Sequence, residues 1–147
     1  MIEPRITKEV DGTIAYFTVY WSRLRKAEKY DIIQKVPSVS GLFELYYEDD
    51  RKKLNLLYVA KAFYGGLMNE LRKRTDPELE DNEKRRRILD THDCYYRYAA
   101  SDSYKDMTDV LYFFSTTYFP DKALHDHSGR FTEIYVKEVS EDKLVDI

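Results

Sequence analysis

Runs of apolar and β-branched residues, separated by charged turns, predict several strands along the chain. Residues 13–21 (TIAYFTVYW) follow an Asp-Gly turn signal and predict the first strand. Two further runs, 42–47 and 54–60, surround a charged tip and predict a β-hairpin. The second run is almost continuously apolar, which is typical of a central strand covered on both faces. Residues 95–100 predict another strand and residues 131–139 an edge strand.

The clearest helix is predicted between Ser103 and Tyr118. Ser103 and Asp106 have the spacing of an N-terminal capping box, and Pro120 follows as a helix stop. Apolar residues recur every three or four positions and form one stripe, which predicts a helix face directed at the core. The stripe consists of Met107, Val110, Leu111, Phe114 and Tyr118.

Other helical segments are shorter or more polar. Residues 67–74 predict a helix after Gly65-Gly66, and residues 23–30 a helix or a long surface connection. The charged residues 77–90 predict a polar helix or an insertion with little core contact. Because strands and helices are mixed without strict βαβ alternation, we expect an α+β fold with a small mixed or antiparallel sheet flanked by helices.

Length and composition are those of one globular domain over residues 1–147, with 43% hydrophobic residues. Cys94 is the only cysteine, so no intrachain disulfide forms, and we expect a reducing, cytoplasmic setting. No apolar run approaches the ~20 residues of a membrane span, and the N-terminus lacks the apolar region of a secretory signal, so no membrane partner is expected. The 14 tyrosines favour an aromatic-rich surface or groove.

The net charge of −3 does not indicate a strongly basic nucleic-acid binder. Basic residues nevertheless cluster at 72–74 and 84–87, where acidic neighbours accompany them. Solvated helix faces are the preferred interpretation of these clusters, and phosphate binding is the alternative.

An ordered set of motifs adds a more specific hypothesis. Residues 32–43 read IIQKVPSVSGLF and residues 57–62 read LYVAKA; a predicted helix, a strand and a second helix ending near Pro120 follow. In this order the segments resemble the GIY-YIG nuclease domain, which also occurs in the bacterial excision-repair nuclease. The resemblance implies a core at about residues 32–125, with an extra N-terminal and an extra C-terminal strand.

The family's chemistry is implied residue by residue. Its members cleave a phosphodiester with one divalent metal, which a glutamate holds, while a tyrosine accepts a proton and an arginine stabilises the phosphate. Tyr58 matches the tyrosine of the second motif, and Arg72 or Arg74 would supply the arginine if an insertion shifts the helix. Phe43 replaces the first motif's tyrosine, and Leu111 stands where the glutamate is expected. We therefore expect a fold without nuclease activity and without a bound metal.

Three functional alternatives remain. In the first, the domain binds DNA or RNA: Lys61, Arg72, Lys73 and Arg74 hold phosphate while strand tyrosines stack on bases. In the second, a divergent Mg²⁺- or Mn²⁺-dependent endonuclease uses Tyr58, Arg72 or Arg74, and a displaced acid such as Asp106 or Asp109. In the third, the aromatic surface forms a protein–protein interface, such as that of a homodimer. The tyrosines considered are Tyr46, Tyr47, Tyr58, Tyr64, Tyr95, Tyr96 and Tyr98.

Histidines and the cysteine offer one further constellation. His125 and His127, together with His92 and Cys94, provide four side chains of the types that hold zinc. Solvated loop histidines and a small core cysteine are the preferred interpretation, so no metal site is predicted.

Overall fold

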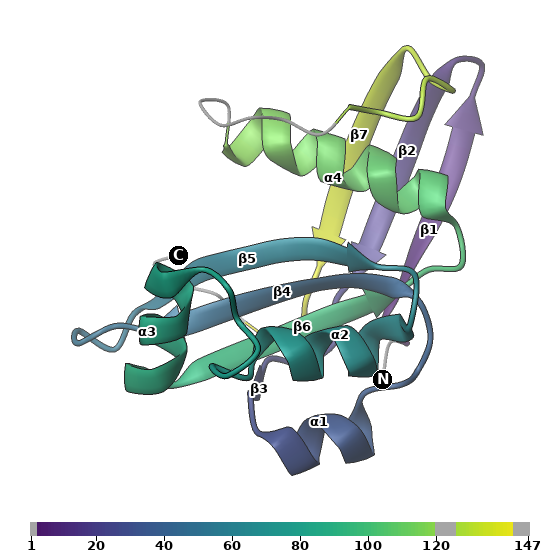
Figure 1. Ribbon diagram of the computed structural model, residues 1–147. Helices are drawn as coiled ribbons and strands as arrows, with labels where there is room; N and C mark the ends of the chain where they lie inside the picture. Colours follow the sequence, from purple (N-terminus) through teal and green to yellow (C-terminus); the bar gives the residue numbers. More distant parts are fainter. Residues whose placement is uncertain (1–2, 120–125, 143–147) are drawn as a thin grey trace.

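The computed structural model describes residues 3–119 and 126–142 (Figure 1). Within them, a seven-stranded mixed sheet is accompanied by four helices, which confirms the predicted α+β class. In chain order the elements are β1 (Arg5–Asp11), β2 (Ile14–Tyr20), β3 (Arg25–Lys26), α1 (Lys29–Lys35), β4 (Gly41–Glu48), β5 (Leu54–Ala62), α2 (Gly66–Arg74), α3 (Glu83–Thr91), β6 (Cys94–Ala100), α4 (Tyr104–Tyr118) and β7 (Glu133–Val139).

The sheet consists of two halves joined at a narrow seam. The strand order is β5-β4-β6-β1-β2-β7, with β3 paired to β6. Strand β4 is antiparallel to both β5 and β6, whereas β2 is antiparallel to β1 and parallel to β7. Between β1 and β6 only Arg5 and Ala100 pair. The sheet bends at this seam, so that the β1-β2-β7 half stands at a steep angle to the β4-β5-β6 half (Figure 1).

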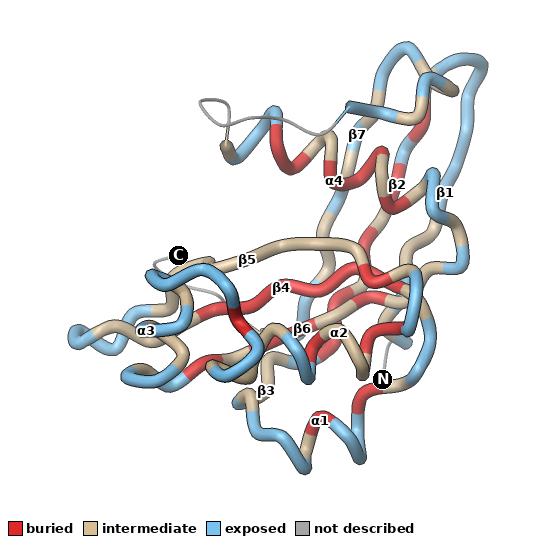
Figure 2. The backbone as a smooth tube through the Cα atoms, in the orientation of Figure 1, coloured by how far each residue is buried: buried red, intermediate tan, exposed pale blue. Residues whose placement is uncertain are grey.

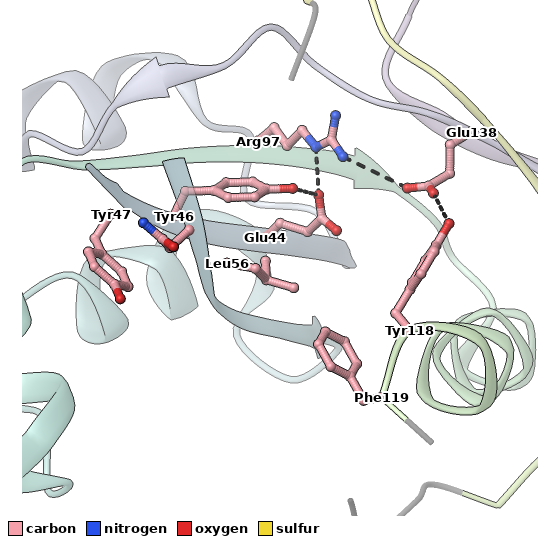
Figure 3. A pocket seen from close by; sticks show the side chains of 9 residues that line it. Glu44, Tyr46, Tyr47, Leu56, Arg97, Tyr118, Phe119 and Glu138 are labelled. Atoms are coloured by element: carbon pink, nitrogen blue, oxygen red, sulfur yellow. Dashed lines mark hydrogen bonds and ion pairs between the residues drawn. The ribbon is translucent and has the colours of Figure 1, made fainter. Parts of the chain in front are cut away.

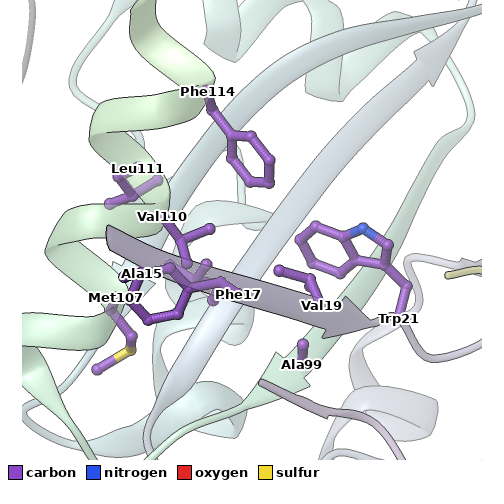
Figure 4. Close-up of a cluster of buried hydrophobic side chains, with 10 residues drawn as sticks. Ala15, Phe17, Val19, Trp21, Ala99, Met107, Val110, Leu111 and Phe114 are labelled. Atoms are coloured by element: carbon purple, nitrogen blue, oxygen red, sulfur yellow. The ribbon is translucent and has the colours of Figure 1, made fainter. Parts of the chain in front are cut away.

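Helix α4 fills the inner side of the bend and forms the first core. Its apolar stripe faces strand β2, as Figure 4 shows. Large side chains of β2, such as Phe17 and Val19, are almost fully buried against it. The buried members of this core are Ala15, Phe17, Val19, Trp21, Leu42, Ala99, Met107, Val110, Leu111 and Phe114.

A second core lies on the other face of the β4-β5-β6 half, under α1 and α2. Strand β4 contributes to both cores, because it lies between two strands and is buried along most of its length (Figure 2). The buried members of the second core are Ile32, Val36, Phe43, Leu45, Ala62, Leu67, Leu71, Cys94 and Tyr96.

The strongest local patterns are confirmed. Helix α4 begins after Ser103, whose hydroxyl accepts a hydrogen bond from the Asp106 amide at 3.1 Å, and its stripe is buried as far as Phe114. Tyr118, which the stripe also included, is half-exposed at 52%. The hairpin of residues 42–47 and 54–60 is present as β4 and β5, and β7 is an edge strand.

The prediction that residues 54–60 form a central strand is wrong, because β5 lies at the edge of the sheet. Helices α2 and α4 contact β5 from its two faces, so apolar side chains are shielded on both sides without a second neighbouring strand. A continuously apolar strand indicates that both of its faces are shielded from solvent. An edge strand can meet this condition as well as a central strand.

Three elements were not predicted from the sequence. The short strand β3 pairs with β6 within residues 23–30, where a helix or a long surface connection was expected. Strand β1 reads RITKEVD and is largely exposed, so it lacks a clear alternation of apolar and polar residues. Helix α1 buries only Ile32 and is capped by Glu28, whose carboxylate accepts hydrogen bonds from two backbone amides. The charged segment 77–90 contains a polar helix, α3, with no buried residue, which is one of the two outcomes that its composition predicted.

Candidate functional site

Tyr58, the tyrosine of the second motif, lies on β5 and faces the second core. Its ring centroid is 5.9 Å from that of Phe43 on the neighbouring strand. Two guanidinium groups approach the same ring: Arg74 of α2 at 4.8 Å and Arg85 of α3 at 4.9 Å from its centroid. The aromatic face of Tyr58 therefore attracts two cations at once.

Glu80 holds these two arginines in place. Its carboxylate, 4% exposed, lies 3.9 Å from Arg74 Nη1 and 3.5 Å from Arg85 Nε. Its carbonyl oxygen accepts two hydrogen bonds from the Arg86 guanidinium, at 3.0 and 2.8 Å. Glu80 thus connects the end of α2 with the beginning of α3, and its negative charge is balanced by cations.

The residues predicted to bind nucleic acid do not form one patch. Arg72 and Lys73 are exposed on α2 and form no ion pair with a described residue, whereas Arg74 belongs to the Tyr58 cluster. Lys61 points to the opposite face of the sheet, where its Nζ lies 3.1 Å from Thr108 Oγ1. The grouping of Lys61 with residues 72–74 is wrong because successive strand residues alternate between the two faces.

Two of the tyrosines proposed to stack on bases are buried. Tyr46 is 2% exposed and Tyr96 0% exposed, so both rings fill the protein interior. Tyr64, at 84% exposure, is open to solvent. Tyr46 and Tyr96 lie on β4 and β6, which are inner strands of the sheet, whereas Tyr64 lies in the bend that follows β5.

The candidate displaced acids already have basic partners on α4's side of the sheet. Asp109 is fully buried, lies 2.7 Å from Arg130 Nη2, and accepts two hydrogen bonds from Ser128. Asp106 lies 2.9 Å from the same Arg130 nitrogen and 3.1 Å from Lys8 Nζ. These contacts attach the segment preceding β7 to α4 and leave neither carboxylate near Tyr58.

The four histidine and cysteine residues considered as zinc ligands are only partly described. His92 packs edge-on against Tyr47, Cys94 is buried, and His127 packs against Tyr112. His125 lies outside the described residues. Across residues 3–119 and 126–142, no group of three or more His, Cys, Asp or Glu side chains has the arrangement of a metal site.

A second candidate site is a pocket at the bend between the two halves of the sheet (Figure 3). Its volume is about 580 Å³, within the range of small-molecule sites. Glu44 of β4 and Arg97 of β6 lie opposite each other in the sheet, with 2.6 Å between Glu44 Oε1 and Arg97 Nε. Both side chains are only 8% exposed, and the Tyr46 hydroxyl donates to the same Glu44 oxygen at 2.6 Å.

Glu138 of β7 completes this polar network from the other half of the sheet. Its Oε1 accepts a hydrogen bond from Trp21 Nε1 at 2.9 Å and lies 3.8 Å from Arg97 Nη2. Its Oε2 accepts one from the Tyr118 hydroxyl at 2.7 Å. The network therefore connects both halves of the sheet with the end of α4.

Burial dominates the electrostatics of the pocket. Desolvation raises the pKa of Glu44 above its ordinary value, and the Arg97 guanidinium and the Tyr46 hydroxyl offset this only in part. The pKa of Tyr46 is also raised, first by burial and then by the negative charge of Glu44. Buried groups with perturbed pKa values beside an open pocket are candidates for a functional role.

Sequence reasoning did not identify this pocket, although a signal was present. Glu44 and Arg97 are single charges inside otherwise apolar or aromatic strand segments, LFELYY and YYRYAA. A charge at such a position is buried and needs a partner of opposite sign. Only the strand register identifies each as the other's partner.

The fold and its two sites define an α+β protein with an arginine-flanked tyrosine on one face of a bent sheet and a charged, aromatic pocket on the other. A family model described as "Uncharacterised protein" matches residues 5–146, so the chain belongs to that family. Comparison with curated proteins and with solved structures gives no match. Among the described helices, none combines the length and apolarity needed to cross a membrane.

Proposed function

We propose that this protein is a GIY-YIG-like domain that binds nucleic acid without cleaving it. The order of its elements supports the proposal: a hairpin (β4 and β5), a helix (α2), a strand (β6) and a helix (α4) follow in the order that the resemblance implies, with α3 as an additional helix between α2 and β6. A cytoplasmic setting belongs to the same proposal and is supported by the buried free thiol of Cys94.

The observation that carries the binding proposal is the surface formed by α2 and α3 around Tyr58. Glu80 holds the two helices together, and Glu70 and Glu80 balance the charges of Arg74 and Arg85. The remaining basic side chains of the two helices point into solvent, where phosphate oxygens could replace water as their partners. They are Arg72, Lys73, Lys84 and Arg87, whereas the guanidinium of Arg86 is bonded to the Glu80 carbonyl oxygen.

Three features support binding over cleavage. Leu111, at the position where the resemblance expects the metal-binding glutamate, is 2% exposed in the first core. Phe43 has no hydroxyl to relay a proton. The carboxylate of Glu80, next to the Tyr58 cluster, is balanced by two arginines.

The test is a titration of fluorescently labelled single-stranded DNA and RNA, followed by anisotropy at several salt concentrations. We expect affinity to fall with salt, because bound basic side chains release counterions from phosphates. The variant Arg72→Gln/Lys73→Gln should reduce the slope of log K against log salt by about 1.4, at roughly 0.7 per lost contact to a single strand. Arg51→Gln/Lys53→Gln is the matched control, since it also removes two exposed charges but from the tip between β4 and β5.

Each outcome points to one of the alternatives. An equal loss of slope in both variants would show that binding does not use the α2–α3 surface. Cleavage with Mg²⁺ or Mn²⁺ that disappears in Tyr58→Phe would establish the divergent endonuclease instead. If no salt-sensitive binding is found, the protein–protein hypothesis takes precedence; its first candidate surface is the stacked pair Tyr16 and Tyr135, 45% and 47% exposed on β2 and β7.

A further inference from the structure

The pocket at the bend of the sheet has an excess of negative charge. The described residues that line it include two carboxylates, Glu44 and Glu138, and one guanidinium, that of Arg97. Arg97 lies between the two acids, 2.6 Å from Glu44 and 3.8 Å from Glu138. An arriving anion would therefore meet two carboxylates around a cation that already has partners.

One carboxylate oxygen of the network is available to a ligand. Glu44 Oε1 accepts hydrogen bonds from both Tyr46 and Arg97, whereas Oε2 accepts none from a described residue. In Figure 3 the second oxygen points towards the space bordered by Leu56 and Tyr118. A carboxylate oxygen has room for two hydrogen bonds, so this atom is a free acceptor in a largely desolvated position.

The walls of the pocket suit the rest of an organic cation. Tyr47, Tyr118 and Phe119 contribute aromatic rings, and Leu56 an aliphatic side chain. Aromatic faces attract ammonium groups and also pack against apolar groups. The volume of about 580 Å³ accommodates a small organic molecule rather than a single ion.

We propose that this pocket binds an organic cation, with its ammonium group at Glu44 Oε2 and its apolar body against Leu56 and the aromatic walls. The cation compensates the excess negative charge and supplies the hydrogen bond that Oε2 lacks. A free amine and the lysine side chain of a peptide carry the same ammonium group. The site is separate from the α2–α3 surface, so it stands independently of nucleic-acid binding.

The experiment compares three probes of similar shape and different charge by NMR titration of the labelled protein at neutral pH. Tyramine carries an ammonium group, 2-(4-hydroxyphenyl)ethanol is neutral, and 4-hydroxyphenylacetate is an anion. We expect saturable shifts with tyramine, centred on β4, β6 and β7, and an affinity at least tenfold higher than for the other two. N-acetyl-lysine methylamide forms a fourth arm, and its binding more tightly than tyramine would identify a peptide side chain as the source of the cation.

Two variants connect binding with the pocket. Leu56→Lys places a competing cation at the wall and should abolish tyramine binding. Leu54→Lys is the matched control on the same strand, and it should leave the affinity within twofold because Leu54 does not line the pocket. Glu44→Gln should lower the affinity for tyramine at least tenfold. If loss of the Glu44 carboxylate unfolds the protein, Leu56→Lys is the variant that tests the proposal.

The proposal is overturned if neither cation binds, or if the neutral or anionic probe binds as tightly as tyramine. It is also overturned if Leu56→Lys and Leu54→Lys bind tyramine equally. None of these results depends on the nucleic-acid titration, so failure of one proposal does not imply failure of the other.

Discussion

Replacing Leu111 tests both the packing of α4 and the absence of a metal ligand at this position. Leu111 is 2% exposed and lies on the stripe that packs against β2. Leu→Ala changes at such sites cost about 2.7–5 kcal/mol, comprising lost transfer free energy and the cavity left behind. We expect about 3 kcal/mol for Leu111→Ala, because its neighbours come from rigid elements on both sides and the cavity cannot close fully.

The assay is urea unfolding followed by circular dichroism. With a slope of about 2 kcal/mol per molar urea, the midpoint should fall by about 1.5 M while the slope stays unchanged. In thermal unfolding the same change corresponds to a decrease of roughly 6–12 °C for a chain of this size. Leu79→Ala is the matched control: the same atoms are removed from a side chain that is 56% exposed, so we expect a change within about 0.5 kcal/mol.

A second substitution tests whether a carboxylate at this position could support metal-dependent cleavage. Leu111→Glu would introduce the carboxylate that the family resemblance expects, but into the apolar first core. We expect the variant to unfold and to show no cleavage with Mg²⁺ or Mn²⁺, because an unpaired buried charge is strongly unfavourable. A stable Leu111→Glu protein with metal-dependent cleavage would refute this reasoning, as would a Leu111→Ala cost no larger than that of Leu79→Ala.

Two further predictions concern buried charges. Asp109→Ala should lower the free energy of unfolding by about 3 kcal/mol in urea titrations, because it leaves Arg130 and Ser128 without their buried partner. The partial exposure of Arg130 limits the loss. A change below about 1 kcal/mol would contradict this. The raised pKa of Glu44 means that the folded state keeps this proton to higher pH than the unfolded state, so its contribution to stability falls as the pH rises above the ordinary value of 4.5. When the pH is raised from about 4.5 to 7, the change in the free energy of unfolding should therefore be more favourable for Glu44→Gln than for the wild type. An equal or less favourable change would show that the pKa of Glu44 is not raised.

Local sequence patterns predicted which segments form helices and strands more reliably than they predicted which of these elements lie side by side. The stripe and capping residue of α4, and the apolar runs of β4 and β5, depend on residues close in sequence, and these were correctly identified. The edge position of β5 depends on which segments cover its faces, and β1 carries too few apolar residues to be recognised.

The candidate sites show the same division. The family resemblance singled out Tyr58 and two possible arginines of α2, and the structure places Arg74 against the ring. Arg85 and Glu80 lie in a charged segment whose composition indicates only solvent exposure, so their part in the cluster could not be foreseen. Glu44 and Arg97 come together through strand register, which apolar patterning alone does not determine.

The parallel pairing of β2 and β7 has a consequence for how the chain folds. Ile14 pairs with Glu133, and Thr13 contacts Thr132 across a sequence separation of 119 residues. Closing so long a loop costs conformational entropy before any contact compensates for it, and such non-local pairings slow folding. Until residues 133–139 arrive, β2 presents an open edge with unpaired backbone groups, which is a template for association with another chain. The β1–β2 hairpin is therefore open to association with other chains until β7 pairs with it.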